Sequence, residues 1–328
     1  MKLNLYDKDL NRIAIIDERY ISCLWSEAYN STAPFTVELN AVDEYKQKIK
    51  EDYYIGRNDR DSLMVIKSVK VEDGTIVASG KTANRVLDDV AFVGTIKSGS
   101  QIDTSISEEY NKSTKYRNVF VRADGLGVEY EHDISHKSFL ELCEIMCGET
   151  DSGFKAIRNG NKVEIVFYKP NEKGNLVFSP KYGNINLNSI SISNETFKNY
   201  AIVLGQGEDE NRTRVDIDKT GGEERREIIF DARFIIQEEG ETDSSYRKRL
   251  SEYGNERLLE YQKIFSCAFA PYAKDFGVKY DLGDILTVYL TDYDIKLQAR
   301  VMRFTQKSQN NKTTTNIEVG NIFVKRGK

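Results

Sequence analysis

Two residue types that carry much protein chemistry are scarce in this chain of 328 residues, which has two histidines and four cysteines. The cysteines are Cys23, Cys143, Cys147 and Cys267, and their scattered positions do not indicate a disulfide framework. With so few histidines and no serine in a nucleophile-elbow motif, no hydrolase signature is present. This scarcity favours a protein that is not an enzyme and holds no cofactor.

Long apolar runs and basic stripes are also missing. The longest apolar runs span about five residues, far short of the roughly 20 that a membrane helix needs. The N-terminus starts with strand-like alternation and has no apolar signal region, so we expect synthesis in the cytoplasm. The formal net charge is −5, and acidic clusters without a basic stripe argue against binding of phosphate backbones. We therefore expect no membrane partner and no sequence-specific nucleic-acid partner.

Strict alternation of apolar and polar residues is the strongest pattern that is present. Between residues 278 and 320, Leu286, Val288 and Leu290 alternate with polar or amphipathic residues, and Val301 closes a second alternating run. A period of two over such lengths predicts half-buried strands. These four residues are the predicted core of a small curled β-barrel.

A similar pattern occurs near the N-terminus. The hairpin of residues 65–80 resembles that of residues 301–320, and both end in glycine, at Gly80 and Gly320. Ile55-Gly56 likewise resembles Leu282-Gly283. Duplication is one interpretation, and chance similarity between two hairpins is the other.

The middle of the chain mixes helical and strand patterns. Residues 82–93 predict a helix, and the polar residues 94–114 predict a domain boundary. Ser135 is the predicted cap of a helix that ends at Gly148. Asn159-Gly160 predicts a tight hairpin turn. A long strand is expected over 227–236, and the longest helix over 243–265, where a Tyr/Leu stripe either packs on its own sheet or binds a partner.

Together these patterns predict a mainly β fold with α+β parts, in which two related small β-barrel domains flank an α+β middle domain and one long helix. The expected segments are a first barrel domain at 1–95, an α+β domain at 96–198, connecting strands and the long helix at 199–265, and a second barrel domain at 266–328.

Few residue clusters suggest chemistry. His132 and His136 lie four residues apart, as do Cys143 and Cys147, a spacing that zinc sites use. The cysteines share an apolar stripe with Phe139, however, which favours a core role. Two further candidates are the Asp-x-Asp pairs at 216–218 and 292–294, which lack the glycine and glutamate of a calcium loop.

A run of motifs resembles a known family. The N-terminal motifs are Trp25 to Ser31, Phe35 to Leu39 and Ser79-Gly80-Lys81 leading to Leu87. The later motifs are Gly153-Phe154 with the Asn-Gly hairpin, Leu176 to Ser179, Gly183-Asn184-Ile185, and Asn199 to Glu208 followed by Arg212 and Arg214. Their order is similar to that of the siphophage tail-tip hub family typified by a protein of Rhodococcus phage ReqiPepy, related to the hub regions of tail-associated lysins and contractile-tail hubs. The chain departs from the family pattern at Ala33 and at Asp88-Asp89.

This resemblance implies a structural tail-tip or baseplate hub in the virion, assembled in the host cytoplasm. It implies a homotrimeric ring in which two barrels per chain match a sixfold tail tube, and through which DNA passes. The implied partners are the distal tail or tail tube protein, the end of the tape-measure protein, and a tail fibre, spike or separate lysin. Acidic loops are expected to face the channel, where they would repel phosphates. Their candidate residues are Glu208, Asp209, Glu210, Glu238, Glu239 and Glu241.

Two functions from other classes remain open. One is a β-rich carbohydrate-binding module for host adhesion, which an exposed aromatic platform with sugar affinity would reveal. The other is a peptidoglycan hydrolase, which is disfavoured because the chain ends where such domains begin in relatives.

Overall fold

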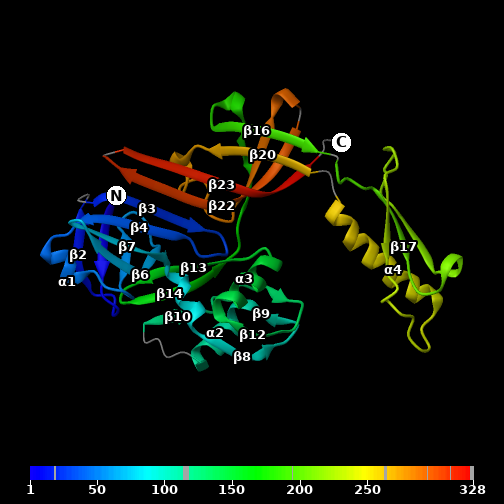
Figure 1. Ribbon diagram of the computed structural model, residues 1–328, viewed down its shortest axis with the longest axis horizontal. Coiled ribbons are helices and arrows are strands. Elements are labelled where there is room, and N and C mark those ends of the chain that lie inside the picture. The colour runs from blue at the N-terminus through cyan, green and yellow to red at the C-terminus, as the bar shows by residue number, and fades with distance from the viewer. Residues whose placement is uncertain are drawn as a thin grey trace. The chain divides into compact units, whose positions relative to one another are not determined.

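The chain is mainly β in the computed structural model (Figure 1). The structure describes residues 1–17, 20–113, 118–193, 195–261, 264–293, 295–310 and 312–325. Among these residues there are 23 β-strands and four α-helices. No helix of the described part is long and apolar enough to cross a membrane. The mainly β class predicted from alternation is confirmed.

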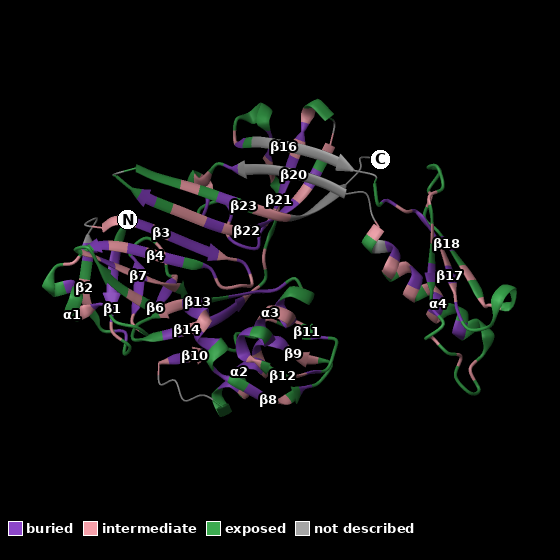
Figure 2. Ribbon diagram, in the orientation of Figure 1, coloured by how far each residue is buried: buried purple, intermediate pink, exposed green. Residues whose placement is uncertain are grey.

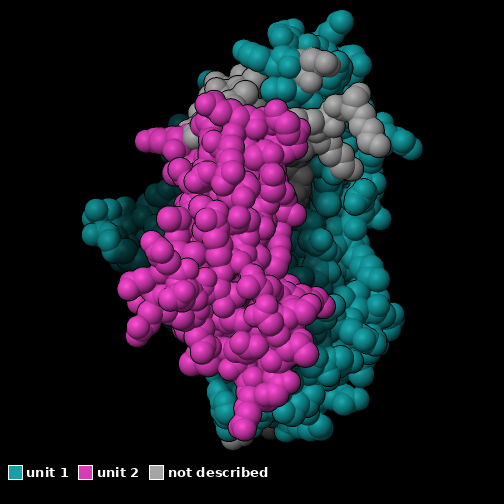
Figure 3. Space-filling view, turned by 90° about the vertical axis from the view of Figure 1, so that its right-hand side faces the viewer, with its two compact units in different colours: residues 1–186, 269–328 teal, residues 187–268 magenta. Residues whose placement is uncertain are grey.

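The chain divides into two compact units. Residues 1–186 and 269–328 form the first unit, and residues 187–268 form the second, as Figure 3 shows in two colours. The second unit is therefore an insertion between two parts of the first.

One large sheet dominates the first unit. It is built from β1 (Lys2–Tyr6), β2 (Arg12–Asp17), β3 (Tyr20–Ala28), β4 (Pro34–Asn40), β5 (Tyr54–Arg57), β6 (Leu63–Glu72), β7 (Thr75–Thr82), β15 (Glu172–Phe178), β21 (Ile285–Leu290), β22 (Ile295–Gln309) and β23 (Lys312–Lys325). Their order is β15-β21-β22-β3-β4-β7-β6-β5-β1-β2, with β23 paired to β22. The short helix α1 (Asp43–Lys48) lies between β4 and β5 in the sequence.

The long strand β22 pairs with strands from both the N-terminal and the C-terminal part of the chain. Its residues 295–300 pair with β21, and its residues 303–309 pair antiparallel with β3. The predicted N-terminal and C-terminal β-units therefore share a single sheet. The described strand order ends at β15 and at β2 without closing on itself, so two separate barrels are not evident in it.

The two hairpins that resemble each other in sequence have matching topology. β5, β6 and β7 form an antiparallel meander, as do β21, β22 and β23. The pairing of β6 with β7 shifts register between Ile66 and Ser68, and that of β22 with β23 shifts between Val301 and Arg303. Each meander thus carries an irregularity in its hairpin.

The predicted core residues of the second β-unit are buried. Leu286 and Val288 lie on β21 and are fully covered, Leu290 is 2% exposed, and Val301 on β22 is fully covered. Figure 2 shows that buried residues recur along these strands. That these residues line a closed barrel stays a prediction.

The middle of the first unit is α+β. Its elements are the 3-10 helix η1 (Ala83–Asp89), β8 (Ala91–Ile96), β9 (Ser100–Gln101), α2 (Ile102–Ser113), β10 (Val119–Val121), β11 (Glu129–Tyr130), β12 (Ile134–Ser138), α3 (Phe139–Glu149), β13 (Gly153–Asn159) and β14 (Lys162–Tyr168). Their apolar residues share one core with Tyr6, Tyr54 and Leu63 of the large sheet.

Several local predictions need correction here. The helix expected over 82–93 is a 3-10 helix that ends at Asp89, because Ala91 already begins strand β8. The boundary expected over 94–114 contains helix α2, whose residues Ile102, Ile106 and Tyr110 are fully buried. Helix α3 is capped by Ser138 rather than Ser135, because Ser138 and Glu141 form a capping box. The Asn159-Gly160 hairpin is as predicted.

The second unit is a small α/β layer. β17 (Tyr200–Leu204) pairs antiparallel with β18 (Arg214–Asp218) and parallel with β19 (Glu227–Asp231). Helix α4 (Asp243–Leu258) covers one face and is followed by the 3-10 helix η4 (Leu259–Tyr261). Their apolar residues form a core of their own. The strand expected over 227–236 ends at Asp231, and the chain continues as a loop.

The remaining short elements are the two-stranded pair of β16 (Ile185–Ser193) and β20 (Ile264–Pro271) and four 3-10 helices, η2 (Pro180–Tyr182), η3 (Asp209–Asn211), η5 (Ala273–Asp275) and η6 (Thr291–Tyr293).

Candidate functional site

The first candidate acidic loop is the tip between β17 and β18. Gly205 and Thr213 close it, because the Gly205 N–H donates to the Thr213 carbonyl at 2.8 Å. Glu208, Asp209 and Glu210 lie at its end, partly within η3, and all three are exposed. The structure thus holds the predicted hairpin and presents its acidic tip to solvent.

The second candidate acidic loop connects β19 to α4 over residues 232–242. Glu238 and Glu239 are exposed, and the Glu238 side chain keeps 78% of its surface accessible. Glu241 behaves differently, because its side chain is only 11% exposed. The three acids of this loop therefore have two distinct roles.

Tyr246 of α4 ties the two loops together. Its hydroxyl accepts a hydrogen bond from the Gln206 N–H at 2.7 Å and donates to the Ile235 carbonyl at 2.8 Å. A Cβ at Gly205 would lie 2.5 Å from the same hydroxyl oxygen, so glycine leaves the room for this approach. Gln206 Oε1 also accepts from the Gln237 N–H at 3.0 Å. The two acidic loops are thus neighbours, which the sequence spacing does not reveal.

Arg249 fixes the inner side of the second loop. Its Nε and Nη2 donate to the two Glu241 oxygens at 2.9 and 2.6 Å, and Nη2 also donates to the Ile236 carbonyl at 2.8 Å. The Arg249 hydrogen bonds, helped by the Glu238 N–H, lower the pKa of Glu241 to about 2. Glu241 is therefore a structural carboxylate.

A second arginine fixes the base of the tip. Arg212 donates to the Leu204 and Gly205 carbonyls and to Asp231 at 2.7 Å. Hydrogen bonds from Arg233 and then Arg212 hold the pKa of Asp231 well below its ordinary value. The base of the loops is therefore held by ion pairs.

The acids at the ends of the two loops contribute negative charge and do not form a metal-binding group. Among the described residues, no ion pair involves Glu208, Asp209, Glu210 or Glu239, whereas Glu238 Oε1 lies 3.9 Å from Arg249 Nη1. Within the described residues, no group of three or more His, Cys, Asp and Glu side chains could hold a metal ion. What this arrangement can do is project a negative potential from a rigid support.

Several of the other residues that the sequence offered as candidate metal ligands or nucleophiles are buried or engaged in contacts with neighbouring side chains. Cys143 and Cys147 are fully buried in α3, and desolvation raises the pKa of both thiols. His132 packs edge-on to Tyr130, with ring centroids 5.7 Å apart. Asp216 is held by Arg214 at 2.8 Å. The histidine and cysteine pairs are not gathered into one metal-binding group.

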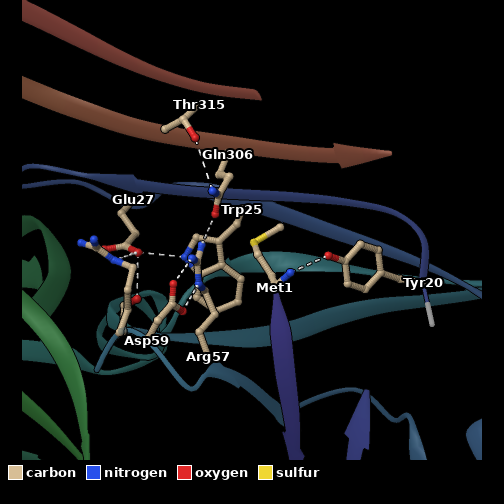
Figure 4. Close-up of polar contacts among 10 residues, drawn as sticks. Met1, Tyr20, Trp25, Glu27, Arg57, Asp59, Gln306 and Thr315 are labelled. Carbon is tan, nitrogen blue, oxygen red and sulfur yellow. Dashed lines mark hydrogen bonds and ion pairs between the residues drawn. The ribbon is translucent and has the colours of Figure 1, made fainter. Parts of the chain in front are cut away.

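Sequence reasoning missed a polar cluster in the first unit, shown in Figure 4. Glu27 at the end of β3 accepts from Arg60 at 2.7 and 3.0 Å, from Trp25 Nε1 at 2.8 Å and from Ser62 at 2.9 Å. The Arg60 guanidinium also lies over the ring of Phe276 at 4.7 Å. Three side chains thus donate to one buried carboxylate, and two of them, Arg60 and Ser62, lie more than 30 residues away in the sequence.

Arg57, which lies beside this cluster, links the loop after β5 to strand β22 (Figure 4). It donates to Asp59 at 2.6 and 2.8 Å and to Gln306 of β22 at 2.8 Å. Both arginines line a cleft of about 740 Å³ in the first unit. The sequence does not reveal these contacts, because the partners Glu27 and Gln306 lie far from residues 57–61 along the chain.

Comparisons with known proteins agree with this architecture. The model of the family described as siphovirus ReqiPepy6 Gp37-like protein matches residues 127–321, more than half of the chain. No curated protein matches the chain.

Solved structures of tail proteins share the fold at low sequence identity. The prophage tail protein gp18 from Listeria monocytogenes EGD-e has a TM-score of 0.61 and 11% identity, with 98% of this chain and 94% of that chain covered. The 43 kDa tail protein of prophage MuSo2 from Shewanella oneidensis has a TM-score of 0.57 and 11% identity, with 98% of each chain covered. A tail protein from Neisseria meningitidis MC58 has a TM-score of 0.53 and 8% identity, with 97% and 95% covered.

Proposed function

The chain belongs to the siphovirus ReqiPepy6 Gp37-like family of tail proteins, and from this premise we propose that it is the structural hub of a phage or prophage tail tip. The observation that carries the proposal is the family match over residues 127–321, which includes most of the second β-unit. The share of the chain that aligns with the prophage tail proteins supports the same architecture. In this proposal the protein acts by assembly and not by catalysis.

The proposed assembly is a homotrimeric ring at the tail tip in the virion. Each chain carries two antiparallel meanders, β5–β7 and β21–β23, so three chains present six related units to a sixfold tail tube. Two small barrels per chain remain part of this proposal. Because β22 pairs with β3, both meanders belong to one sheet and keep a fixed arrangement within each chain.

The proposed neighbours lie on both sides of the ring. They are the distal tail or tail tube protein, the end of the tape-measure protein, and a fibre, spike or separate lysin. We place assembly in the host cytoplasm before the particle is released.

We further propose that at least one of the acidic loops faces the lumen. Glu208, Asp209 and Glu210 are exposed at the end of a hairpin, and Glu238 and Glu239 stand beside them on a braced loop. Negative side chains on a channel wall would repel DNA phosphates and keep the strand from adhering. Glu241 would support this surface through Arg249 rather than face DNA itself.

The assembly is tested by mass photometry of the purified chain, alone and with its distal tail partner. Trimers are expected in at least one of the two samples. Monomers that persist in both would argue strongly against the hub. A zymogram on peptidoglycan tests the alternative of a peptidoglycan hydrolase, and a cleared zone would contradict a purely structural role.

The position of the loops is tested by charge reversal in the parent phage. Glu208→Lys with Glu210→Lys should slow DNA ejection, most strongly at low salt, because phosphates would then be attracted. Asp73→Lys in the exposed turn between β6 and β7 is the matched control. Equal ejection rates for both variants would place the tip outside the lumen.

A further inference from the structure

The loop between β19 and α4 exposes large apolar side chains beside its acids. Phe234 is 68% exposed and Ile236 is 62% exposed. Ile235 between them points the other way and packs against the core of the second unit. The loop therefore has an inward anchor and two outward apolar side chains.

The backbone that carries these side chains is held in place. The Ile235 carbonyl accepts from the Tyr246 hydroxyl at 2.8 Å, the Ile236 carbonyl accepts from Arg249 at 2.8 Å, and the Gln237 N–H donates to Gln206 at 3.0 Å. Three consecutive residues are thus bound to other elements. A surface fixed in this way loses little conformational entropy when a partner binds to it.

Phe234 continues the apolar surface onto helix α4. Its ring meets the ring of Tyr253 edge-on, with centroids 5.3 Å apart and an interplanar angle of 83°. We call Phe234, Ile236 and Tyr253 the apolar strip. Aromatic and aliphatic side chains exposed together on a rigid support are typical of interaction surfaces.

The charges around the apolar strip select its partner. Glu238 and Glu239 follow it directly, and the Gln206–Gln237 hydrogen bond brings the base of the acidic tip beside it. Arg249 pairs with Glu241 at 2.6 Å, and Arg212 and Arg233 share Asp231 at 2.7 and 2.8 Å. These three arginines stand against seven carboxylates of the two loops and their base, namely Glu208, Asp209, Glu210, Asp231, Glu238, Glu239 and Glu241. The field at the strip is therefore negative, and a complementary segment must be basic.

We propose that the apolar strip is a docking site for a basic amphipathic segment of another tail polypeptide, whose apolar side chains cover Phe234 and Ile236 and whose lysines or arginines face Glu238 and Glu239. This deepens the proposed function and rests on it for the partner's place in the tail. The contact combines apolar burial with charge pairing at the rim, so its affinity depends on Phe234 and Ile236, and its salt dependence on the acids.

The test uses the full chain and a defined probe, a fluorescein-labelled amphipathic peptide of leucine and lysine, with binding followed by fluorescence anisotropy. The matched probe has glutamate in place of every lysine. The double variant Phe234→Ser with Ile236→Ser should weaken binding by about tenfold or more, since both side chains are exposed and their loss leaves the core intact. Val93→Ser, at a site 83% exposed in the first unit, is the control and should bind as the wild type does.

The contribution of the acids is tested with the double variant Glu238→Gln with Glu239→Gln. This variant should bind the lysine peptide more weakly at low salt and equal the wild type at high salt, because the attraction is screened there. The glutamate peptide should bind poorly to every variant.

Three results would overturn the proposal. One is equal binding of the lysine peptide to the wild type and the serine variant. Another is equal affinity for both peptides. The third is self-association of the free chain that requires Phe234 and is competed by the peptide, which would assign the strip to a second copy. Binding is measured on the free chain, so a failure of the trimer in mass photometry stays distinguishable from a failure here.

Discussion

Arg60 donates from Nε to Glu27 Oε1 at 2.7 Å, and this ion pair fastens the loop after β5 to the end of β3. The Glu27 side chain is 8% exposed and that of Arg60 is 16% exposed, so water competes weakly for either charge. Burial by itself would lower the pKa of Arg60, but the charge of Glu27 raises it above its ordinary value. Each charged side chain of the pair therefore compensates for the burial of the other.

Removing Glu27 should destabilise the first unit strongly. Glu27→Ala removes the acceptor of Trp25 Nε1 and Ser62 and leaves Arg60 with only the longer ion pair to Asp281 at 3.5 Å, and breaking a buried pair costs about 3–5 kcal/mol. Urea unfolding of the purified chain measures the loss. Glu72→Ala, which removes an exposed partner of Lys70, is the control and should change stability by less than about 1 kcal/mol. Similar losses for both variants would show that the buried cluster is not a stability determinant.

Two helix glycines should respond in opposite ways to alanine. A Cβ at Gly254 of α4 would collide with the side chains of Ile217 and Val203, so Gly254→Ala should cost about 1–3 kcal/mol through overpacking. A Cβ at Gly148 of α3 would meet no atom within 4 Å, so Gly148→Ala should gain about 0.5–1 kcal/mol from helix propensity. Thermal unfolding followed by circular dichroism compares the two. A gain in both helices would contradict the close approach of α4 to its sheet.

A charge placed within β21 should prevent folding of the second β-unit. Leu286 and Val288 are fully buried, and an unpaired aspartate at either site costs several kcal/mol. Leu286→Asp and Val288→Asp are therefore expected to unfold or aggregate. Val278→Asp, at a site 83% exposed, should fold normally. Cooperative native-like melting of either buried variant would refute the assignment of these residues to the core.

The brace between Glu241 and Arg249 should make stability depend on acid pH. The folded pKa of Glu241 is about 2 and its ordinary value is 4.5, so the carboxylate stabilises the fold above pH 4.5. That contribution is lost progressively as the pH falls from 4.5 to 2. NMR titration of the Glu241 carboxyl carbon should give the low pKa directly.

Glu241→Gln is the control for this titration. Its unfolding free energy should fall less steeply across the same acid range, because a group that binds protons mainly when unfolded has been removed. An unchanged slope would mean that the brace does not form in solution.

Local patterns in the sequence predicted elements well where the pattern was strong. The buried face of α3 at Phe139, Cys143 and Cys147 follows the helical period, and the Asn159-Gly160 turn forms where expected. The start of α3 was misplaced because two serines precede it. Only Ser138 stands three residues before a glutamate that completes a capping box.

Sparse apolar patterns were harder to interpret. Helix α2 has Ile102, Ile106 and Tyr110 at four-residue spacing, but the polar residues between them resemble a linker. Tertiary packing makes this segment a helix, because those three side chains fill the core that α3 and η1 share. The opposite error occurred after Asp231, where apolar residues Phe234 to Ile236 suggested that strand β19 continues.

The sequence by itself determined the mainly β class, the burial of Leu286 and Val288, and the exposure of the acidic tip, because each depends on periodicity or on local turn chemistry. Only the tertiary structure decided that β22 pairs with β3, that Glu27 receives Arg60, and that Tyr246 joins the two acidic loops. These contacts link residues tens to hundreds of positions apart. Such long-range pairings are set by the packing of whole elements, which leaves no periodic signal in the chain.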